Sequence, residues 1–489
     1  MTTLHARTAL TEEGWRRDVR LEIDGSGTIA ALASGVGSAG AVVGKDRDRA
    51  AEVDDGHGDG DGDGVGDEAI DAGAEVTVDV LLPAPANLHS HAFQRAIAGR
   101  TERRGPDGRD SFWSWRETMY RFLERLDPDD VEAIAAFAQM EMLEAGFAAV
   151  AEFHYLHHGP GGVPYADLGE LSARIAAAAR TSGIGLTLLP VLYVAGGCDG
   201  RALAGGQRRF GNEETRFAAL HERAAVAVRA LPDDARLGVA AHSLRAVSPA
   251  QLRTATALAP RAPFHLHIAE QPAEVDEVRR ALGARPIEWL LGNHDVDARW
   301  CLIHATQATD AELDGLARSG AVAGLCPITE ANLGDGLFGA RRYLDAGGAL
   351  GVGSDSNLRI SLAGELRTLE HGQRLRDGER AVLADATRST GRRLLEEACA
   401  GGARAAGRAS GAIAPGRLAD LVALDGKATS LLGTEEDTTI DAFAFAGGDD
   451  AITDVWAAGR HVVREGRHVR REAIERRYRE TVLGLSART

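Results

Sequence analysis

The strongest constraint on the fold is an alternation between short apolar segments and longer segments of helical composition, from about residue 78 to residue 405. The helical segments are rich in Ala, Arg and Glu, as at Asp129–Ala145 and Ser248–Ala259. Such alternation is typical of parallel strands joined by crossover helices. About eight such units indicate an α/β fold built on a TIM-type (β/α)8 barrel, whose catalytic groups lie at the carboxyl ends of the strands. The predicted strands after the first are Ala148–Phe153, Gly185–Val194, Arg236–Ala241, Ala262–Ile268, Arg299–His304, Gly320–Cys326 and Ala349–Ser354.

Both ends of the chain have a different pattern from the predicted barrel. Short, turn-punctuated apolar segments of β type occupy Leu4–Leu32, and others follow residue 405 at Gly411–Leu424 and Val455–Val463. We therefore expect residues 1–83 and 406–489 to pair into a small β-sandwich beside a barrel formed by residues 84–405.

An acidic tract rich in Gly and Asp, at residues 44–73, interrupts the N-terminal segment. It has almost no apolar residues and cannot form a core, so we predict a flexible insertion. Asp59, Asp61, Asp63 and Gly64 fit the first half of a calcium-binding EF-hand loop, but Ile70 stands where the loop needs a glutamate. This mismatch argues against a calcium loop.

Charge and composition limit the classes of binding partner and the location that the chain is expected to have. The formal net charge of −17 over 489 residues argues against a basic surface that binds nucleic acid or an anionic membrane. This charge is compatible with a small anionic substrate, provided that arginines make the electrostatic potential of the binding site positive. We find no signal peptide and no apolar span of membrane length, and the four cysteines form no Cys-x-x-Cys pair. The expected location is therefore the cytoplasm.

Four segments place metal-binding side chains at strand ends. His89 and His91 close the apolar run Val78–Leu88, and residues two apart on a strand share a face, so both imidazoles can reach one cation. A lone His-x-His is weak evidence, but three later strands end in residues of the same kind. With an open position for water, we expect His89, His91, His267 and Asp355 to bind one divalent cation, zinc being the expected ion. The later segments are His265-Leu-His267-Ile-Ala-Glu270, Cys301-Leu-Ile-His304 and Gly351-Val-Gly-Ser-Asp355-Ser-Asn357.

Three residues near these ligands are candidate catalytic groups. Glu270 stands three residues after His267, just beyond the strand end, and His304 ends the next strand. Asp355 can bind metal and also take a proton. The alternatives are a solvated glutamate at a helix N-terminus, a core imidazole and a helix N-cap, respectively. His265 competes with His267 as a ligand, but only His267 is followed by a carboxylate at this spacing.

The motifs at 89–91, 265–270, 302–304 and 351–357 resemble the amidohydrolase superfamily, over the barrel and both terminal segments. Longer segments resemble one of its families, the formimidoylglutamate deiminases: Asn87–Arg95, Glu152–His158, Leu325–Gly336 and Gly353–Asn357. Two features depart from the family pattern. Ala84-Pro85-Ala86 replaces a glycine-containing turn, and the acidic tract is an addition.

The superfamily resemblance also bears on the number of metal ions. Many superfamily hydrolases bridge two ions with a carbamylated lysine inside the barrel. The only lysines here, Lys45 and Lys427, lie outside the predicted barrel, so such a bridge is excluded. Glu152 leaves a glutamate bridge open, although one ion is the simpler interpretation.

The family resemblance implies hydrolysis of N-formimidoyl-L-glutamate to N-formyl-L-glutamate and ammonia, in histidine degradation. It implies that Asp355 with His304 takes a proton from the attacking water and that Glu270 protonates the departing nitrogen. It also selects five residues for binding this small dicarboxylate, most of them on loops after strand ends. We expect a homodimer without nucleic acid or membrane partners. The substrate-binding residues are Gln94, Arg116, Tyr155, His242 and Arg245.

Two alternatives remain open at this stage. A related aminohydrolase could act on a purine, pyrimidine or triazine ring, although paired arginines suit a dicarboxylate better. A non-catalytic homologue is the other alternative, but such chains usually lose ligands, and every expected ligand is present here.

Overall fold

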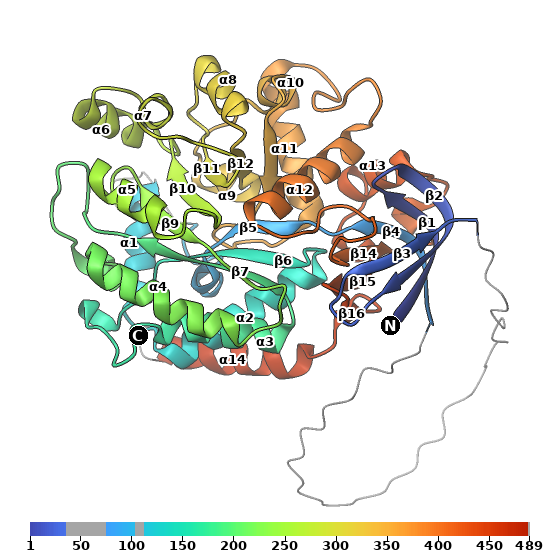
Figure 1. Cartoon of the computed structure of the whole chain (residues 1–489), viewed down its shortest axis with the longest axis horizontal. Coiled ribbons are helices and arrows are strands. Elements are labelled where there is room, and N and C mark those ends of the chain that lie inside the picture. The colour runs from blue at the N-terminus through green and yellow to red at the C-terminus, as the bar shows by residue number, and fades with distance from the viewer. Residues whose placement is uncertain (36–74, 103–111, 488–489) are drawn as a thin grey trace, which may run out of the picture.

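The computed structural model describes residues 1–35, 75–102 and 112–487, and the predicted acidic insertion at residues 44–73 lies outside them. The described residues form a large barrel of strands and helices beside a smaller sheet built from both ends of the chain (Figure 1). In the described part of the chain, no helix has the length and apolar character needed to cross a bilayer.

Eight parallel strands form the barrel, in the order β5, β6, β7, β9, β10, β11, β12 and β13. A parallel bridge between Ser90 and Asp355 links the two end strands, so the predicted TIM-type barrel is confirmed. A short strand, β8 (Arg236–Leu237), also pairs with β7. The barrel strands are β5 (Ala86–Ser90), β6 (Ala149–His154), β7 (Gly185–Leu192), β9 (Val239–Ser243), β10 (Phe264–Ile268), β11 (Trp300–His304), β12 (Val322–Leu325) and β13 (Ala349–Val352).

Helices cover the barrel, and several begin where the sequence supplies a cap. The Asp127, Ser248 and Thr309 side chains each accept a hydrogen bond from the first turn of the helix that follows. The helices of this region are α1 (Phe112–Leu123), α2 (Pro128–Glu144), α3 (Glu170–Ser182), α4 (Glu214–Arg229), α5 (Pro249–Leu258), α6 (Pro272–Leu282), α7 (Pro286–Asn293), α8 (Asp310–Ser319), α9 (Pro327–Leu333), α10 (Ala340–Asp345), α11 (Leu362–Asp377) and α12 (Thr390–Ala405). Short 3-10 turns include η1 (Ala92–Ile97) and η3 (Gly205–Arg209).

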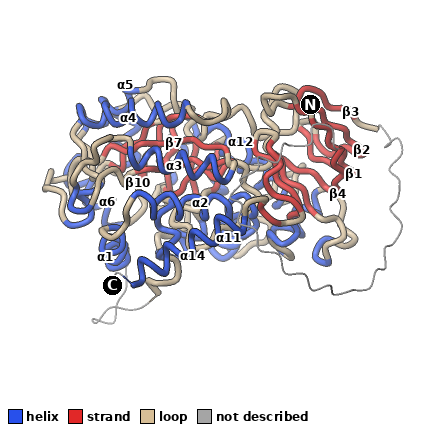
Figure 2. Tube along the Cα trace, turned by 90° about the horizontal axis from the view of Figure 1, so that it is seen from below, coloured by secondary structure: helices blue, strands red, loops and turns tan. Residues whose placement is uncertain are grey.

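The predicted pairing of the two termini is confirmed, and their strands form one continuous hydrogen-bonded sheet (Figure 2). Its order is β17, β16, β15, β14, β4, β1, β2, β3, so the contact between the two halves is the antiparallel pair of β14 and β4. The strands are β1 (Thr2–Thr11), β2 (Gly14–Ile23), β3 (Ile29–Ala33), β4 (Glu75–Pro83), β14 (Leu421–Leu424), β15 (Ile452–Ala457), β16 (Arg460–Arg464) and β17 (Arg467–His468).

The C-terminal segment also contains α13 (Asp437–Phe445) and α14 (Arg471–Ala487), which the pattern of short strands did not predict. Helix α14 packs against α2 of the barrel, where the rings of Tyr478 and Phe137 stack with centroids 3.9 Å apart. The C-terminal segment therefore contributes to both parts of the molecule.

A buried ion network joins the barrel to the terminal sheet. The Arg408 side chain is 0% exposed and donates hydrogen bonds to the carboxylates of Asp234, before β8, and Asp420, before β14. Arg460 of β16 also donates to Asp234, with N–O distances of 2.8 and 2.9 Å. Because buried charges are tolerated only when paired, these contacts fix the sheet against the barrel.

Candidate functional site

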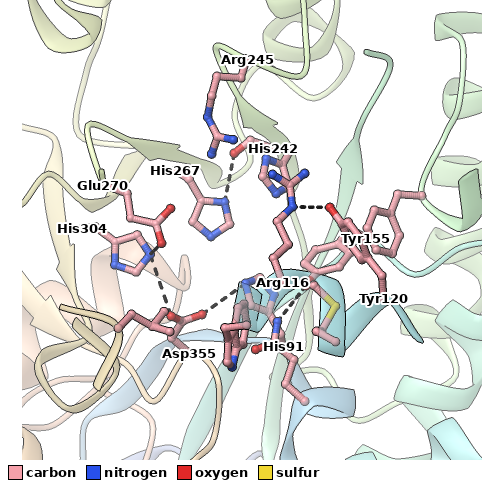
Figure 3. A pocket seen from close by; sticks show the side chains of 15 residues that line it. His91, Arg116, Tyr120, Tyr155, His242, Arg245, His267, Glu270, His304 and Asp355 are labelled. Atoms are coloured by element: carbon pink, nitrogen blue, oxygen red, sulfur yellow. Dashed lines mark hydrogen bonds and ion pairs between the residues drawn. The ribbon is translucent and has the colours of Figure 1, made fainter. Parts of the chain in front are cut away.

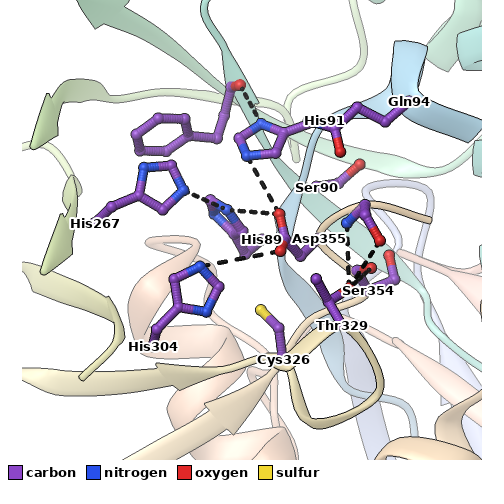
Figure 4. Close-up of polar contacts among 12 residues, drawn as sticks. His89, Ser90, His91, Gln94, His267, His304, Cys326, Thr329, Ser354 and Asp355 are labelled. Carbon is purple, nitrogen blue, oxygen red and sulfur yellow. Dashed lines mark hydrogen bonds and ion pairs between the residues drawn. The ribbon is translucent and has the colours of Figure 1, made fainter. Parts of the chain in front are cut away.

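The carboxyl ends of three strands, β5, β10 and β13, bring three histidines and an aspartate together at one end of the barrel (Figure 4). His89 Nε2 lies 3.0 Å from His267 Nε2 and 3.4 Å from Asp355 Oδ1. His91 Nε2 lies 3.3 Å from the same carboxylate oxygen. Every one of the four side chains is buried. The residues predicted as ligands from distant parts of the sequence therefore face one another.

Backbone carbonyls orient two of the imidazoles. His91 Nδ1 lies 3.1 Å from the carbonyl oxygen of Phe153, and His267 Nδ1 lies 3.0 Å from that of His242. A carbonyl oxygen only accepts hydrogen bonds, so each Nδ1 carries the proton and each Nε2 presents a lone pair to the cluster. This is the tautomer that a metal ligand needs.

The protonation states suit a cation. Burial lowers the pKa of His89 to about 3 and also lowers the pKa of His91 and His267, so these imidazoles are neutral at neutral pH. Burial alone would raise the pKa of Asp355, but the neighbouring histidines, His89 first, lower it overall. Lone pairs of neutral imidazoles around an ionised carboxylate form a donor set that fits a divalent cation such as zinc.

One group of possible ligand atoms differs by one residue from the predicted set. Atoms of His89, His267, His304 and Asp355 all lie within 4.8 Å of one another, so His304 takes the place of His91 in this group. Yet His91 Nε2 also faces Asp355, whereas His304 Nε2 is 3.9 Å from Asp355 Oδ2. Both histidines thus border the place where a cation would lie.

Glu270 and His304 stand beside this cluster. Glu270 Oε1 is 3.8 Å from His304 Nε2. Burial raises the pKa of Glu270 to about 7, although the nearby His304 opposes the rise. Burial alone would lower the pKa of His304, but the Glu270 carboxylate and a hydrogen bond to Glu330 raise it overall. A carboxyl group that titrates near neutral pH therefore lies on one side of Asp355, beside an imidazole whose pKa is raised.

His265 and Glu152, the other two residues considered from the sequence as possible metal ligands, make different contacts. His265 Nε2 is 2.8 Å from the carbonyl oxygen of Ala405, so its ring is used in packing the barrel. The Glu152 carboxylate accepts a 2.8 Å hydrogen bond from the backbone nitrogen of Ala92. Neither residue belongs to the groups of possible metal ligands among the described residues.

A pocket opens onto the cluster (Figure 3). All five predicted substrate-binding residues line it, together with His91, His267, Glu270, His304 and Asp355. The wall also includes residues that the sequence reasoning missed: Trp115, Met119, Tyr120, Phe210 and Leu333. Three of these share one face of α1 with Arg116, since residues three and four apart on a helix are neighbours, and that periodicity could have identified them.

The polar residues of the pocket hold one another in place. Gln94 Nε2 donates to the Tyr155 hydroxyl at 2.8 Å. Arg116 donates to the hydroxyls of Tyr120 and Tyr193, the second at 3.0 Å. In Figure 3 the guanidinium groups of Arg116 and Arg245 both lie on the side of the pocket away from Asp355. A substrate with a reacting carbon at the cluster would therefore place its far end near two cations.

Arg245 itself is nearly enclosed. Its side chain is 8% exposed, and Nε lies 4.0 Å from Oε1 of the buried Glu274. Glu274 also accepts a 3.0 Å hydrogen bond from the backbone nitrogen of Glu270 through its other oxygen. One buried glutamate thus contacts both ends of the pocket.

Comparison with known proteins gives two family matches. Residues 80–462 match the model described as the amidohydrolase family, and residues 1–43 match the model of the N-terminal domain of the formimidoylglutamate deiminase HutF. A Pseudomonas aeruginosa protein named formimidoylglutamate deiminase is 46% identical over 480 residues, which are 98% of each chain.

Solved structures give the same picture of the fold. The crystal structure of an amidohydrolase from Brucella melitensis is 44% identical, with a TM-score of 0.88, and the match covers 99% of this chain and 100% of that one. An adenosine deaminase from Xanthomonas campestris, solved with bound zinc, is 20% identical, with a TM-score of 0.77 over 99% and 98% of the two chains. The second likeness is one of fold alone.

Proposed function

The chain belongs to the amidohydrolase family, and on that premise we propose that it hydrolyses N-formimidoyl-L-glutamate to N-formyl-L-glutamate and ammonia, a step of histidine degradation. The observation that carries the proposal is the pocket in which Arg116 and Arg245 lie opposite the cluster of His89, His267 and Asp355. The 46% identity over nearly the whole chain to a protein named formimidoylglutamate deiminase supports the same reaction.

His89, His91, His267 and Asp355 are the proposed ligands of one divalent cation, zinc. The support is the donor set, with three neutral, buried imidazoles around an ionised carboxylate. When bound there, zinc supplies a Lewis acid that makes a water molecule more acidic near neutral pH.

Asp355 and His304 take the proton of the attacking water. Asp355 Oδ2 and His304 Nε2 are 3.9 Å apart, so both groups can face one attacking water molecule. The water oxygen forms a bond to the formimino carbon as this proton leaves.

Glu270 then delivers a proton to the departing nitrogen. Its pKa of about 7 lets the carboxyl group carry a proton at neutral pH. The water oxygen loses its second proton as the formyl C=O bond forms, so the two protons lost by the water balance the two gained by the departing nitrogen. The bond from carbon to nitrogen breaks, ammonia departs, and the formyl group stays on the glutamate.

Arg116 and Arg245 bind the two carboxylates of the substrate. A guanidinium can hold a carboxylate through two parallel hydrogen bonds, and a neutral ring has no group of this kind. Gln94, Tyr155 and His242 also line the pocket and supply further hydrogen-bonding groups.

The test is ammonia release by the purified, zinc-loaded chain. N-formimidoyl-L-glutamate is expected to give the highest kcat/KM, formimidoyl-L-aspartate a lower one, and guanine and cytosine no turnover above background. Faster turnover of either ring would replace the proposal with a ring aminohydrolase. A failure on all four compounds, with zinc bound, would indicate a non-catalytic homologue.

A further inference from the structure

Glu330 lies in the segment Leu325–Gly336, whose residues have no part in the mechanism above. Its side chain is 7% exposed and extends from α9 toward β11. Oε1 accepts a 2.8 Å hydrogen bond from the backbone nitrogen of Cys326 and lies 3.2 Å from His304 Nδ1. A carboxylate fixed by the backbone thus contacts the ring nitrogen of His304 that faces away from the cluster.

The other nitrogen of the same ring faces the reacting groups. His304 Nε2 lies 3.8 Å from Glu270 Oε1 and 3.9 Å from Asp355 Oδ2. An ionised carboxylate only accepts hydrogen bonds, so Nδ1 must carry the proton that forms the 3.2 Å contact. The contact therefore fixes both the tautomer and the rotation of the ring, as carboxylate partners of catalytic histidines do in other enzymes.

We propose that Glu330 is the positioning residue for His304. Its carboxylate holds Nδ1–H and so keeps Nε2 directed at the proton that leaves the attacking water. This inference rests on the proposed function, since the role of His304 comes from it.

Thr329, the residue before Glu330, contacts the neighbours of Asp355. Thr329 Oγ1 donates to the carbonyl oxygen of Ser354 at 3.2 Å and lies 2.9 Å from Ser356 Oγ. Ser354 and Ser356 flank Asp355, so one turn of α9 contacts His304 through Glu330 and the two neighbours of Asp355 through Thr329. Figure 4 shows Thr329 beside Ser354. The backbone of His304 has a φ of 70° and that of Asp355 a φ of 46°, a region that side chains other than Gly rarely adopt. Residues in such conformations keep their place only when their surroundings hold them there.

The kinetic test compares Glu330→Gln with a matched variant, Glu312→Gln, both zinc-loaded. Glutamine keeps the length of the side chain and a carbonyl oxygen for the Cys326 nitrogen, but removes the charge. Glu312 of α8 is a suitable control because it is also buried and also reaches back to a backbone nitrogen, that of Thr309 at 2.8 Å, outside the pocket. We expect kcat to fall about 10–100-fold in Glu330→Gln with KM within about threefold, and both constants to stay within about twofold in Glu312→Gln.

The spectroscopic test does not depend on the substrate. A hydrogen-bonded imidazole N–H gives a downfield proton resonance in water, and the signal that is missing in His304→Gln belongs to His304. We expect this resonance to move upfield in Glu330→Gln, to disappear in Glu330→Ala and to stay unchanged in Glu312→Gln.

The outcomes separate this inference from the proposed function. If the parent chain does not act on formimidoylglutamate, the proposed function fails, and the resonance alone decides whether Glu330 holds His304. An unchanged resonance in Glu330→Gln overturns the inference, as does a kcat within twofold of the parent. A higher KM with an intact kcat, or equal losses in the Glu312 control, also overturns it. Should Glu330→Ala fail to fold, Glu330→Gln carries both tests.

Discussion

Replacing Arg245 with methionine is expected to weaken binding of formimidoylglutamate far more than it disturbs the fold. The Arg245 side chain is 8% exposed, and its Nε is 4.0 Å from the Glu274 carboxylate. Two unit charges at that distance interact with about 4 kcal/mol at an effective dielectric constant of about 20. A substrate carboxylate bound at a similar distance gains a comparable attraction, within the roughly 2–5 kcal/mol lost when one partner of a buried charge pair is truncated.

The expected loss in kcat/KM is therefore about 30-fold at the lower limit and about 10³-fold near 4 kcal/mol. The lost arginine also leaves Glu274 without this cation, so its carboxylate repels the substrate and favours the larger figure. The loss should appear mainly in KM, because the arginine binds the substrate equally before and during the reaction.

The assay is steady-state ammonia release, with zinc content measured on the same samples. Arg393→Met is a matched control, because Arg393 is also buried, with a 9% exposed side chain, and lies on α12 outside the pocket. Arg245→Met that retains its zinc and turns over formimidoylglutamate within twofold of the parent would refute the dicarboxylate assignment. So would an equal loss in Arg393→Met, since that would indicate general destabilisation.

Three further predictions address the metal, the acid and the fold. His267→Ala should lose both bound zinc and activity, measured by elemental analysis and ammonia release, and full turnover without metal would exclude a metal mechanism. Glu270→Gln should lower kcat by at least about 10²-fold while zinc stays bound, and a near-normal kcat would assign the proton to another group. Arg408→Met should lower the free energy of unfolding at pH 7 by about 3–5 kcal/mol in urea titrations, because it removes the cation that pairs with the buried Asp420 and one of the two cations that pair with the buried Asp234. Burial alone raises the pKa of Asp234, but Arg460 and Arg408 lower it overall, so the stabilisation by its carboxylate is present above pH ~4 and lost below it. The difference in unfolding free energy between Arg408→Met and the parent should therefore shrink in acid. A difference that is independent of pH would contradict this account.

The barrel could be predicted from the sequence because its signals are local. Each buried strand is a short apolar run, and helices such as α5 begin at a capping residue, Ser248, that the sequence displays. The carboxyl ends of parallel strands meet at one rim, so the expectation that His89, His267 and Asp355 converge needed no distance information.

Features that depend on contacts between distant segments were missed. No sequence pattern near Arg408 predicts its partner Asp234, which is 174 residues away. Helix α14 follows a series of short strands, and its place against α2 depends on the pairing of Tyr478 with Phe137. The segment Leu325–Gly336 resembles the family as a whole, but nothing in it predicts a role for Glu330, because its partner His304 lies on another strand.

The backbone at the site was also beyond the reach of sequence patterns. The left-handed region is usually signalled by Gly or Asn, whereas His304, Ala305 and Asp355 adopt it with φ of 70°, 50° and 46°. Neighbouring strands impose these conformations: the Ala305 nitrogen donates to the Ile268 carbonyl at 3.0 Å, and the Asp355 nitrogen donates to the His89 carbonyl at 2.9 Å. The second of these bonds belongs to the contact that links the first and last strands of the barrel. The direction of the proposed proton acceptors is therefore set by closure of the barrel, which no single segment encodes.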